Sequence, residues 1–403
     1  MKADLDRLME ERGLDALVVA GRADEANMLY VLGGVAIQGA VYIKKRGDPG
    51  VVCHGTMERG EASKTGLRTR NLGLYDWKDL LQQARGDPLE ARVLLFRRLF
   101  EDEGVRGRVA FYGEMDQGAA YRFLGRLACD LEDVEVVGEY GRSVLAVARE
   151  TKDPHEVDEI RKAGAAAQRV VHRTAEFLRG CPVGGGVLRK QDGSPLTVGD
   201  VKARIRAWLA EEGLEGPDII FAQGRDAGFP HSRGEDAHPL AAGSPIVFDV
   251  FPRRAGGGYH FDMTRTWCIG RPSEELLRVY RDVYECYVSV TEALRPGTPC
   301  AELQRMACEF FESRGHPTVC TQPTTQVGYV HSLGHGLGLD VHEEPRLSDY
   351  PGNDAVLRPG CVVTVEPGLY YPDSGIGVRL EDVWAITEDG AVNLGGYPVE
   401  LVL

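Results

Sequence analysis

Five ionisable side chains in the carboxyl-terminal part of this chain constrain its fold more than any other feature. Each lies in or beside a short apolar run that is typical of a buried strand, where a carboxylate is costly unless it is neutralised. The five residues are Asp249, Asp262, His335, Glu366 and Glu381. Four carboxylates and one imidazole that gather in one place carry a formal charge of −4, and we expect cations to neutralise it.

Two divalent cations would balance this charge. A pair of metal ions roughly 3.5–4 Å apart, held by bridging carboxylates, is a recurrent hydrolytic site. A donor set made mostly of oxygen atoms suits Mn²⁺, Co²⁺ or Zn²⁺ better than it suits a metal that prefers thiolates. The sequence therefore predicts a site for two divalent ions, with Mn²⁺ as the first expectation.

The length and charge of the chain narrow the class of protein. At 403 residues the chain is too long for one ordinary core, so we expect two or three domains. A hydrophobic content of 43% and a charged content of 27% are typical of a soluble globular protein. The net charge of −14 argues against nucleic acid and anionic membranes as partners, and no apolar run reaches the roughly 18 residues of a membrane-spanning helix.

The amino terminus and the cysteines indicate a cytoplasmic protein. The opening sequence is acidic and lacks the basic start and the cleavage site of a signal peptide. The nine cysteines are odd in number, scattered and without a CxxC pair, which favours a reducing compartment. Four of them lie in apolar or helical patterns and are expected to be small buried apolar residues: Cys268, Cys286, Cys308 and Cys361.

Residues 1–148 are predicted to form an α/β domain, because short apolar runs alternate with helical patterns. The expected strands cover residues 15–21, 39–45, 50–55, 108–113 and 134–139, and the expected helices cover residues 5–13 and 87–104. We find no metal cluster, phosphate loop or nucleophile motif in this part of the sequence. Its expected role is structural or dimerising.

Residues 149–403 are predicted to form an α+β domain of helices packed on an antiparallel sheet. A polar ETKDP turn opens the domain, and Pro154 suits the first turn of a long helix, where no N–H is needed. Three further helix boundaries are expected at Thr197, Ser273 and Gly315. The glycine-rich stretch 182–195 is predicted to be a surface hairpin.

Histidines and one arginine extend the candidate site. The segment HSLGHGLGLDVH contains His331, His335 and His342 among glycines that permit close backbone approach, and only His335 is needed as a metal ligand. His231 lies in a loop before the first aspartate strand, and an ordinary surface role for it stays open. Arg379 precedes Glu381 by two residues and so shares its strand face; a plain surface ion pair is its alternative.

These segments resemble the creatinase/aminopeptidase P/prolidase family of metallopeptidases (M24), which has the pita-bread fold. The matching segments, in the family's order, are PHSRG, DVFPRRAGGGYHFDMTRT, HSLGHGLGLDVHEEP, TVEPGLYYPD and GVRLEDV. They fall within about residues 150–403, and the preceding part resembles the α/β amino-terminal domain of the longer family members. The resemblance implies a pita-bread catalytic domain.

The resemblance also implies a role for each candidate residue. It assigns two metals to Asp249, Asp262, His335, Glu366 and Glu381, with Asp262 and Glu381 bridging them. It implies that His231 and His342 contact substrate and stabilise the tetrahedral intermediate, and that His331 and Arg379 support the site. Phe251 stands where relatives usually have glycine, and the interval between the two aspartates is longer than usual, so we expect the shape of this hairpin, and not its ligands, to depart from the family's pattern.

A metal-dependent Xaa-Pro peptidase is the function that the resemblance implies. Its substrate would be a small peptide with proline at the second position, Glu366 would shuttle the proton, and the enzyme would be a homodimer. Aminopeptidase P, which cleaves longer peptides, is favoured over prolidase, which cleaves dipeptides, because neither Arg346 nor Arg358 convincingly matches the arginine with which prolidases bind the dipeptide carboxylate. A non-peptidase hydrolase or lyase, or a metal-free binding module, stays open.

Overall fold

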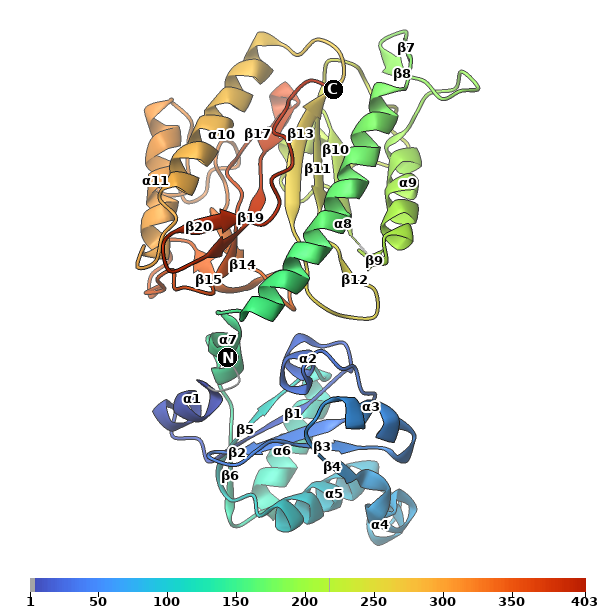
Figure 1. Ribbon diagram of the computed structural model, residues 1–403, viewed down its shortest axis with the longest axis vertical. Helices are drawn as coiled ribbons and strands as arrows, with labels where there is room; N and C mark the ends of the chain where they lie inside the picture. Colours follow the sequence, from blue (N-terminus) through green and yellow to red (C-terminus); the bar gives the residue numbers. More distant parts are fainter. Residues whose placement is uncertain (1–3, 217) are drawn as a thin grey trace. The chain divides into compact units, whose positions relative to one another are not determined.

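The computed structural model describes residues 4–216 and 218–403, and the chain divides into two compact units (Figure 1). The first unit extends to Arg149 and includes Gly256–Gly258; the second comprises Glu150–Ala255 and Tyr259–Leu403. The domain boundary expected between residues 148 and 149 stays a prediction. In the described part of the chain, no helix is long and apolar enough to cross a membrane.

The first unit is built on a six-stranded mixed sheet with the strand order β4-β3-β2-β1-β5-β6. The strands are β1 (Ala16–Ala20), β2 (Val41–Lys45), β3 (Val51–His54), β4 (Arg68–Asn71), β5 (Gly107–Tyr112) and β6 (Val134–Val137). The helices are α1 (Leu5–Glu11), α2 (Ala26–Leu32), α3 (Arg59–Lys64), α4 (Trp77–Gln83), α5 (Pro88–Glu103), α6 (Gln117–Asp130) and α7 (Val144–Arg149). All five expected strands and both expected helices are confirmed.

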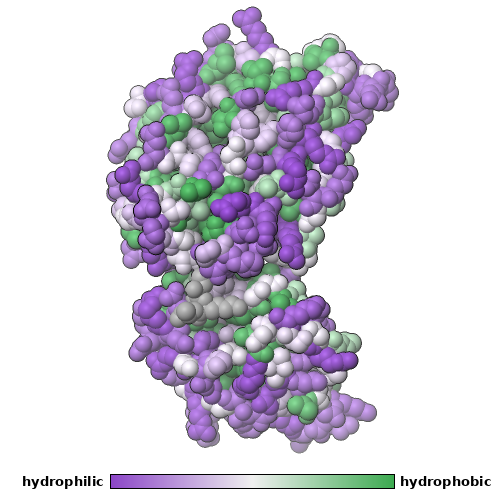
Figure 2. Space-filling model, viewed as in Figure 1, coloured by the Kyte–Doolittle hydropathy of each residue, from purple (hydrophilic) through white to green (hydrophobic). Residues whose placement is uncertain are grey.

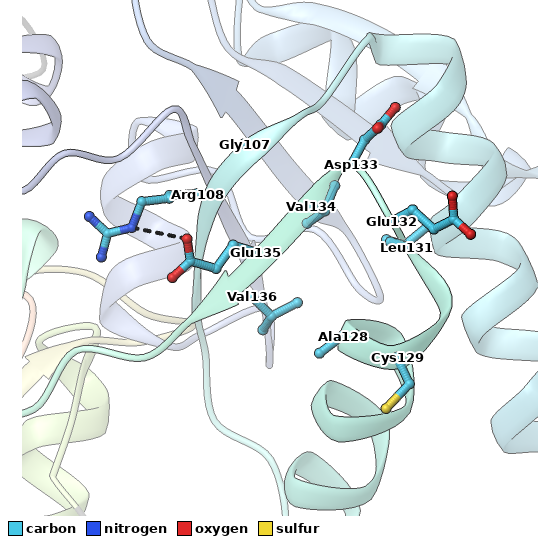
Figure 3. Close-up of a pocket in the computed structure, with 10 residues that line it drawn as sticks. All are labelled: Gly107, Arg108, Ala128, Cys129, Leu131, Glu132, Asp133, Val134, Glu135 and Val136. Atoms are coloured by element: carbon cyan, nitrogen blue, oxygen red, sulfur yellow. Dashed lines mark ion pairs between the residues drawn. The ribbon is translucent and has the colours of Figure 1, made fainter.

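Aromatic side chains fill the core of the first unit. Phe96 of α5 lies with its ring centroid 5.0 Å from that of Phe123 of α6 and 6.2 Å from that of Phe111 of β5. Helix α5 begins where the Asp87 side chain accepts hydrogen bonds from the first backbone N–H groups, and it ends at Gly104, whose positive φ of 62° suits glycine. Figure 3 shows a surface pocket of this unit beside β6. That pocket contains none of the candidate site residues.

One half of the second unit consists of two helices on an antiparallel three-stranded sheet. The sheet has the order β10 (Ile219–Gln223), β11 (Pro245–Val250) and β13 (Met263–Cys268). Helices α8 (Pro154–Arg179) and α9 (Val198–Glu211) share a buried core with these strands. Asp153 and Glu156 form a capping box at the start of α8, and the Thr197 side chain caps α9.

The other half repeats this plan with a larger sheet. Its five-stranded sheet has the order β15 (Glu343–Leu347), β14 (Gly334–Gly336), β16 (Val362–Val365), β19 (Asp382–Ile386) and β20 (Ala391–Asn393). Strands β17 (Gly368–Tyr371) and β18 (Ile376–Arg379) form a separate hairpin. Helices α10 (Glu274–Glu292) and α11 (Cys300–Ser313) cover this half, so the sheets lie between two helix pairs (Figure 1).

Short strands and surface features complete the second unit. The remaining strands are β7 (Val183–Gly184), β8 (Val187–Leu188), β9 (Leu214–Glu215) and β12 (Arg253–Arg254). Because β7 pairs with β8 in antiparallel fashion, the predicted hairpin at 182–195 is confirmed. On the face shown in Figure 2, hydrophilic residues cover most of the surface of each unit.

One of the four cysteines expected to be buried also forms a disulfide, which the sequence did not predict. Cys308 is buried as expected, but it forms a disulfide with Cys320 and is not a free thiol. Helix α11 presents Cys308 to the polar segment that follows the helix, and this segment folds back to bring Cys320 against it. The other three expected cysteines are free and buried.

Two buried residues tie the halves of the second unit together. Thr264 of β13 forms an antiparallel bridge with Glu381, whose backbone N–H donates to the Thr264 carbonyl at 3.1 Å. The adjacent Arg265, 1% exposed, donates to the Glu381 carbonyl at 2.8 Å and to Asp382 Oδ1 at 2.9 Å. Tyr287 donates to the other oxygen of Asp382. Both carboxylate oxygens of Asp382 thereby accept hydrogen bonds. Glu381 lies at the junction of the sheets.

Candidate metal centre

The two candidate aspartates lie side by side on the first sheet. Asp249 is in β11, every residue of which is buried, and it pairs with Thr264 of β13. Asp262 directly precedes β13 and is also buried. Within the described residues, Asp249 Oδ1 and Asp262 Oδ1 are buried without any hydrogen-bond donor. Two orphaned carboxylate oxygens in an apolar sheet fit a site for cations.

Glycines let His335 approach the first sheet from β14. A Cβ atom at Gly334 would lie 2.1 Å from the Thr364 carbonyl oxygen, and one at Gly336 would lie 2.1 Å from the Glu344 carbonyl oxygen. Only glycine fits at these two positions. His335 Nδ1 lies 3.0 Å from the Gly336 carbonyl oxygen, which can only accept, so Nδ1 carries the proton. His335 Nε2 is therefore free to offer its lone pair to a metal.

Three of the five candidate ligands form one tight group. Single ligand atoms of Asp262, His335 and Glu381 all lie within 4.8 Å of one another. Glu366, directly after β16, has Oε1 3.4 Å from His335 Nε2. Asp249 contacts this group less directly and has its Oδ2 2.6 Å from Arg379 Nη2. The structure thus brings together residues that are up to 132 positions apart only because the two sheets meet.

The carboxylates of this group resist ionisation in the absence of a cation. Burial, reinforced by the neighbouring Asp249 and Glu366 carboxylates, raises the pKa of Asp262 well above its ordinary value. Burial raises the pKa of Glu366 to about 8. Burial and the Asp262 carboxylate raise the pKa of Glu381 in the same way. Positive charge is needed before all of these groups can ionise together, which fits the chemistry of a metal site.

The Arg379 guanidinium connects three groups around the candidate ligands by hydrogen bonds. Its guanidinium donates to Asp249 Oδ2, to the Tyr370 hydroxyl at 2.8 Å and to the Pro230 carbonyl at 3.1 Å. Arg379 is 3% exposed, so the alternative of a plain surface ion pair does not hold. Because Pro230 directly precedes His231, Arg379 also fixes the loop that carries this histidine.

The remaining candidate histidines surround the group at different depths. His331 Nε2 lies 3.0 Å from the Tyr370 hydroxyl, and burial lowers the pKa of His331 to about 4. The exposed His342 ring lies edge-on to the His335 ring, with centroids 4.4 Å apart. His231 is also exposed, and its charge is among those that lower the pKa values of His331 and His342.

Two residues of the site, Tyr370 and Arg346, were not among the site residues predicted from the sequence. Tyr370 is buried, and its hydroxyl contacts both Arg379 and His331; its place in the TVEPGLYY segment is the signal that could have found it. Arg346 pairs with His335 across β15 and β14 and is exposed. Its positive charge contributes to the lowered pKa of His335 and His342 and partly opposes the raised pKa of Glu366. Among the residues that the structure describes, the Arg346 guanidinium has no ion-pair partner.

Comparisons with known proteins agree with this geometry. The model of metallopeptidase family M24 matches residues 158–388. The probable dipeptidase PepE of Mycobacterium tuberculosis is 36% identical over 261 residues, which are 64% of this chain and 62% of that protein. The Xaa-Pro dipeptidase of Pyrococcus furiosus is 36% identical over 205 residues, which are 50% of this chain and 55% of that protein. The chain thus aligns with less than two thirds of the length of these curated relatives.

A solved structure supports the fold along the whole chain. The X-Pro aminopeptidase from Thermotoga maritima superposes with a TM-score of 0.77 at 23% identity, and the match covers 98% of this chain and 100% of that one. This likeness concerns the fold alone. Together with the family match, it confirms the predicted fold class, an α/β unit followed by an α+β pita-bread unit.

Proposed function

The chain belongs to metallopeptidase family M24, and from that premise we propose that it is a metal-dependent Xaa-Pro peptidase. It would hydrolyse the bond between an N-terminal residue and a following proline. The observation that carries the proposal is the convergence of Asp262, His335 and Glu381, together with the orphaned Oδ1 atoms of Asp262 itself and of Asp249. The names of the relatives support the choice of a proline-directed peptidase.

We propose that the site holds two divalent ions, with Mn²⁺ first and Co²⁺ or Zn²⁺ as alternatives. The ligands would be Asp249, Asp262, His335, Glu366 and Glu381, and the oxygen-rich set supports this choice of ions. When bound, the ions would supply a water that is nucleophilic at neutral pH. Glu366 differs from the other carboxylates because its side chain is 18% exposed. It is therefore placed to carry a proton between solvent-side water and the leaving proline nitrogen.

His231 and His342 are proposed to bind the substrate. Both are exposed and lie at the rim of the group, where an imidazole N–H can donate to the negative oxygen of the tetrahedral intermediate. His331, Tyr370 and Arg379 form the hydrogen-bonded support behind them. In this arrangement, Arg379 orients Asp249 and the loop that carries His231.

The position of Arg346 shifts our preference from aminopeptidase P to a dipeptidase. Directly opposed residues of an antiparallel pair project from the same face of the sheet, so Arg346 projects on the side of His335. A guanidinium on the same sheet face as His335 suits the carboxylate of a dipeptide, which it can bind with two hydrogen bonds. Longer peptides have no carboxylate there.

Comparison of Xaa-Pro dipeptides with Xaa-Pro-Yaa tripeptides tests this preference. Arg346→Met should raise KM for the dipeptide by roughly 10–100-fold, the effect of losing a charged hydrogen bond, and should change KM for the tripeptide much less. Arg358→Met is the control for the loss of an arginine outside the site. Because Arg358 pairs with the buried Glu150, its replacement should lower stability and leave KM for both substrates near wild type. A wild-type preference for tripeptides, or an equal effect of Arg346→Met on both substrates, would favour aminopeptidase P.

Metal dependence tests the broader proposal. Removal of divalent ions should abolish proline release from an Xaa-Pro peptide, and Mn²⁺ or Co²⁺ should restore it. Metal analysis of the restored protein should find up to two ions per chain. Full activity of a metal-free sample contradicts the proposal. A metal-loaded protein that cleaves no Xaa-Pro peptide would point to a non-peptidase hydrolase or lyase.

A further inference from the structure

Gln304 is a buried amide in an otherwise apolar row of helix α11. It is 1% exposed, and its neighbours on the buried face of the helix are Leu303, Ala307 and Phe311. An amide in such a place is costly unless its hydrogen bonds are made. Its partners therefore indicate what the side chain does.

The partners of Gln304 lie mainly in the segment that leads into β14. Its Oε1 accepts from the Leu333 backbone N–H at 2.6 Å and from the Tyr329 hydroxyl at 3.2 Å. Its Nε2 donates to the His331 carbonyl at 3.5 Å and to Cys308 Sγ at 3.6 Å. One side chain thus holds three of the five residues from 329 to 333.

The held segment contacts the candidate metal centre at two points. The Leu333 carbonyl accepts from the Glu366 backbone N–H at 2.8 Å, so the position of Leu333 sets the position of Glu366. The His331 imidazole contacts the Tyr370 hydroxyl, which Arg379 also binds. Leu333 N–H also donates to the Leu347 carbonyl at 3.1 Å, which links the segment to the next strand but does not replace the bond to the helix.

We propose that Gln304 is a positioning residue for the metallopeptidase site. It ties helix α11 to the backbone of His331 and Leu333 and thereby fixes the His331 ring and the Glu366 main chain. The proposal rests on the proposed function for its catalytic consequence, but its structural part concerns only the backbone of residues 331–333. Residues that orient groups at a metal site typically change metal affinity or activity by 10–100-fold when they are replaced.

Two substitutions separate the roles of the amide. Gln304→Met has a similar length and lacks both polar groups, so it removes all four contacts. Gln304→Glu keeps an acceptor for Leu333 N–H and the Tyr329 hydroxyl but places a carboxylate against the His331 carbonyl. Ala307→Gly, on the same buried helix face, is the control for general destabilisation of the helix.

Hydrogen exchange by mass spectrometry in the metal-free protein gives a readout that needs no activity. Gln304→Met should accelerate exchange of the amides at 331–333, Gln304→Glu should do so to a smaller extent, and Ala307→Gly should leave them near wild type. Mn²⁺ titration should then show affinity reduced by about 10–100-fold for Gln304→Met alone, with a matching fall in kcat and a smaller change in KM.

The outcomes distinguish this proposal from the proposed function. Wild-type exchange and Mn²⁺ affinity in a folded Gln304→Met protein would overturn the positioning role, whatever the wild-type enzyme cleaves. If Gln304→Met does not fold, Gln304→Glu decides, and exchange at 331–333 no faster than in Ala307→Gly would overturn the role. Failure of the wild-type protein to cleave Xaa-Pro peptides would count against the proposed function and leave the exchange result intact.

Discussion

The Glu366 carboxyl should make the metal-free protein lose stability as pH rises. Burial raises its pKa from 4.5 to about 8, so the folded state keeps this proton in a range where the unfolded state has lost it. The stabilising contribution is therefore complete below about pH 4.5 and is lost as pH rises towards 8. Between pH 5.5 and 8, the linkage relation gives a loss of about 3 kcal/mol.

Buried histidines act in the opposite direction and require a matched variant. Burial lowers the pKa of His335 to about 3 and that of His331 to about 4, so both stay neutral in the fold while the unfolded chain takes up protons below about pH 6.5. Their effect makes stability increase with pH through that range. Glu366→Gln leaves these histidines in place and removes the Glu366 titration, because a glutamine side chain resembles the protonated acid at every pH. It also removes the charge by which Glu366 raises the pKa of Asp262 and Glu381, so the comparison reports Glu366 together with its effect on these two neighbours.

The measurement is thermal unfolding of both metal-free proteins in a chelator from pH 5.5 to 8. The wild-type melting temperature should fall relative to that of Glu366→Gln by roughly 6–12 °C across this range, because 1 kcal/mol corresponds to about 2–4 °C for a unit of this size. Saturating Mn²⁺ should reverse the order, because a carboxylate binds the ion and an amide binds it weakly. A melting difference that stays constant with pH would refute the claim that Glu366 is desolvated in this site.

Three further predictions follow from the proposed site. His335→Ala should lose metal, whereas His342→Ala should keep it and lose mainly kcat, by about 10²–10³-fold; metal analysis showing the reverse would contradict the ligand assignment. In the Mn²⁺-loaded enzyme, Glu366→Gln should lower kcat by at least about a hundredfold with little change in KM, and near-normal turnover would remove Glu366 from the mechanism. The protein should be a homodimer in which the first unit contacts the partner's catalytic unit; light scattering at micromolar concentration measures the mass, and a strictly monomeric mass would argue against a dimer.

The elements that the sequence predicts well are those with an apolar pattern of their own. Strand β1 is a continuous apolar run, β3 is apolar up to His54, and α5 has both an aspartate cap and a glycine stop. The edge strand β4 has the sequence RTRN, with its first two residues exposed and its last two partly buried. It therefore lacks the alternation of apolar and polar residues that would predict a strand. Its place beside β3 is set by pairing with a distant segment, which local pattern does not report.

The candidate ligands were predictable because a charged residue in an apolar strand is unusual. The residues that surround these ligands, such as Tyr370 and Arg346, were not predictable in this way. Tyr370 looks like an ordinary core residue of β17 until its hydroxyl partners are brought to it, Arg379 from β18 and His331 from the segment before β14. Arg346 faces His335 across a pairing whose register shifts directly after His335, and such a shift is invisible in the sequence. The Cys308–Cys320 disulfide was missed for a related reason, since spacing alone does not determine cysteine pairing.

The junction between the two sheets of the second unit has a kinetic consequence. Asp249 and Asp262 come from one sheet, whereas His335 and Glu366 come from the other, and Glu381 lies where Thr264 bridges them. Neither half carries the whole proposed ligand set, so an ion can bind tightly only to a chain whose halves have already docked. The ion would then bind late in folding and stabilise the docked halves, and it would not nucleate folding. Mn²⁺ added during refolding should leave the early rates unchanged and should slow unfolding of the finished protein.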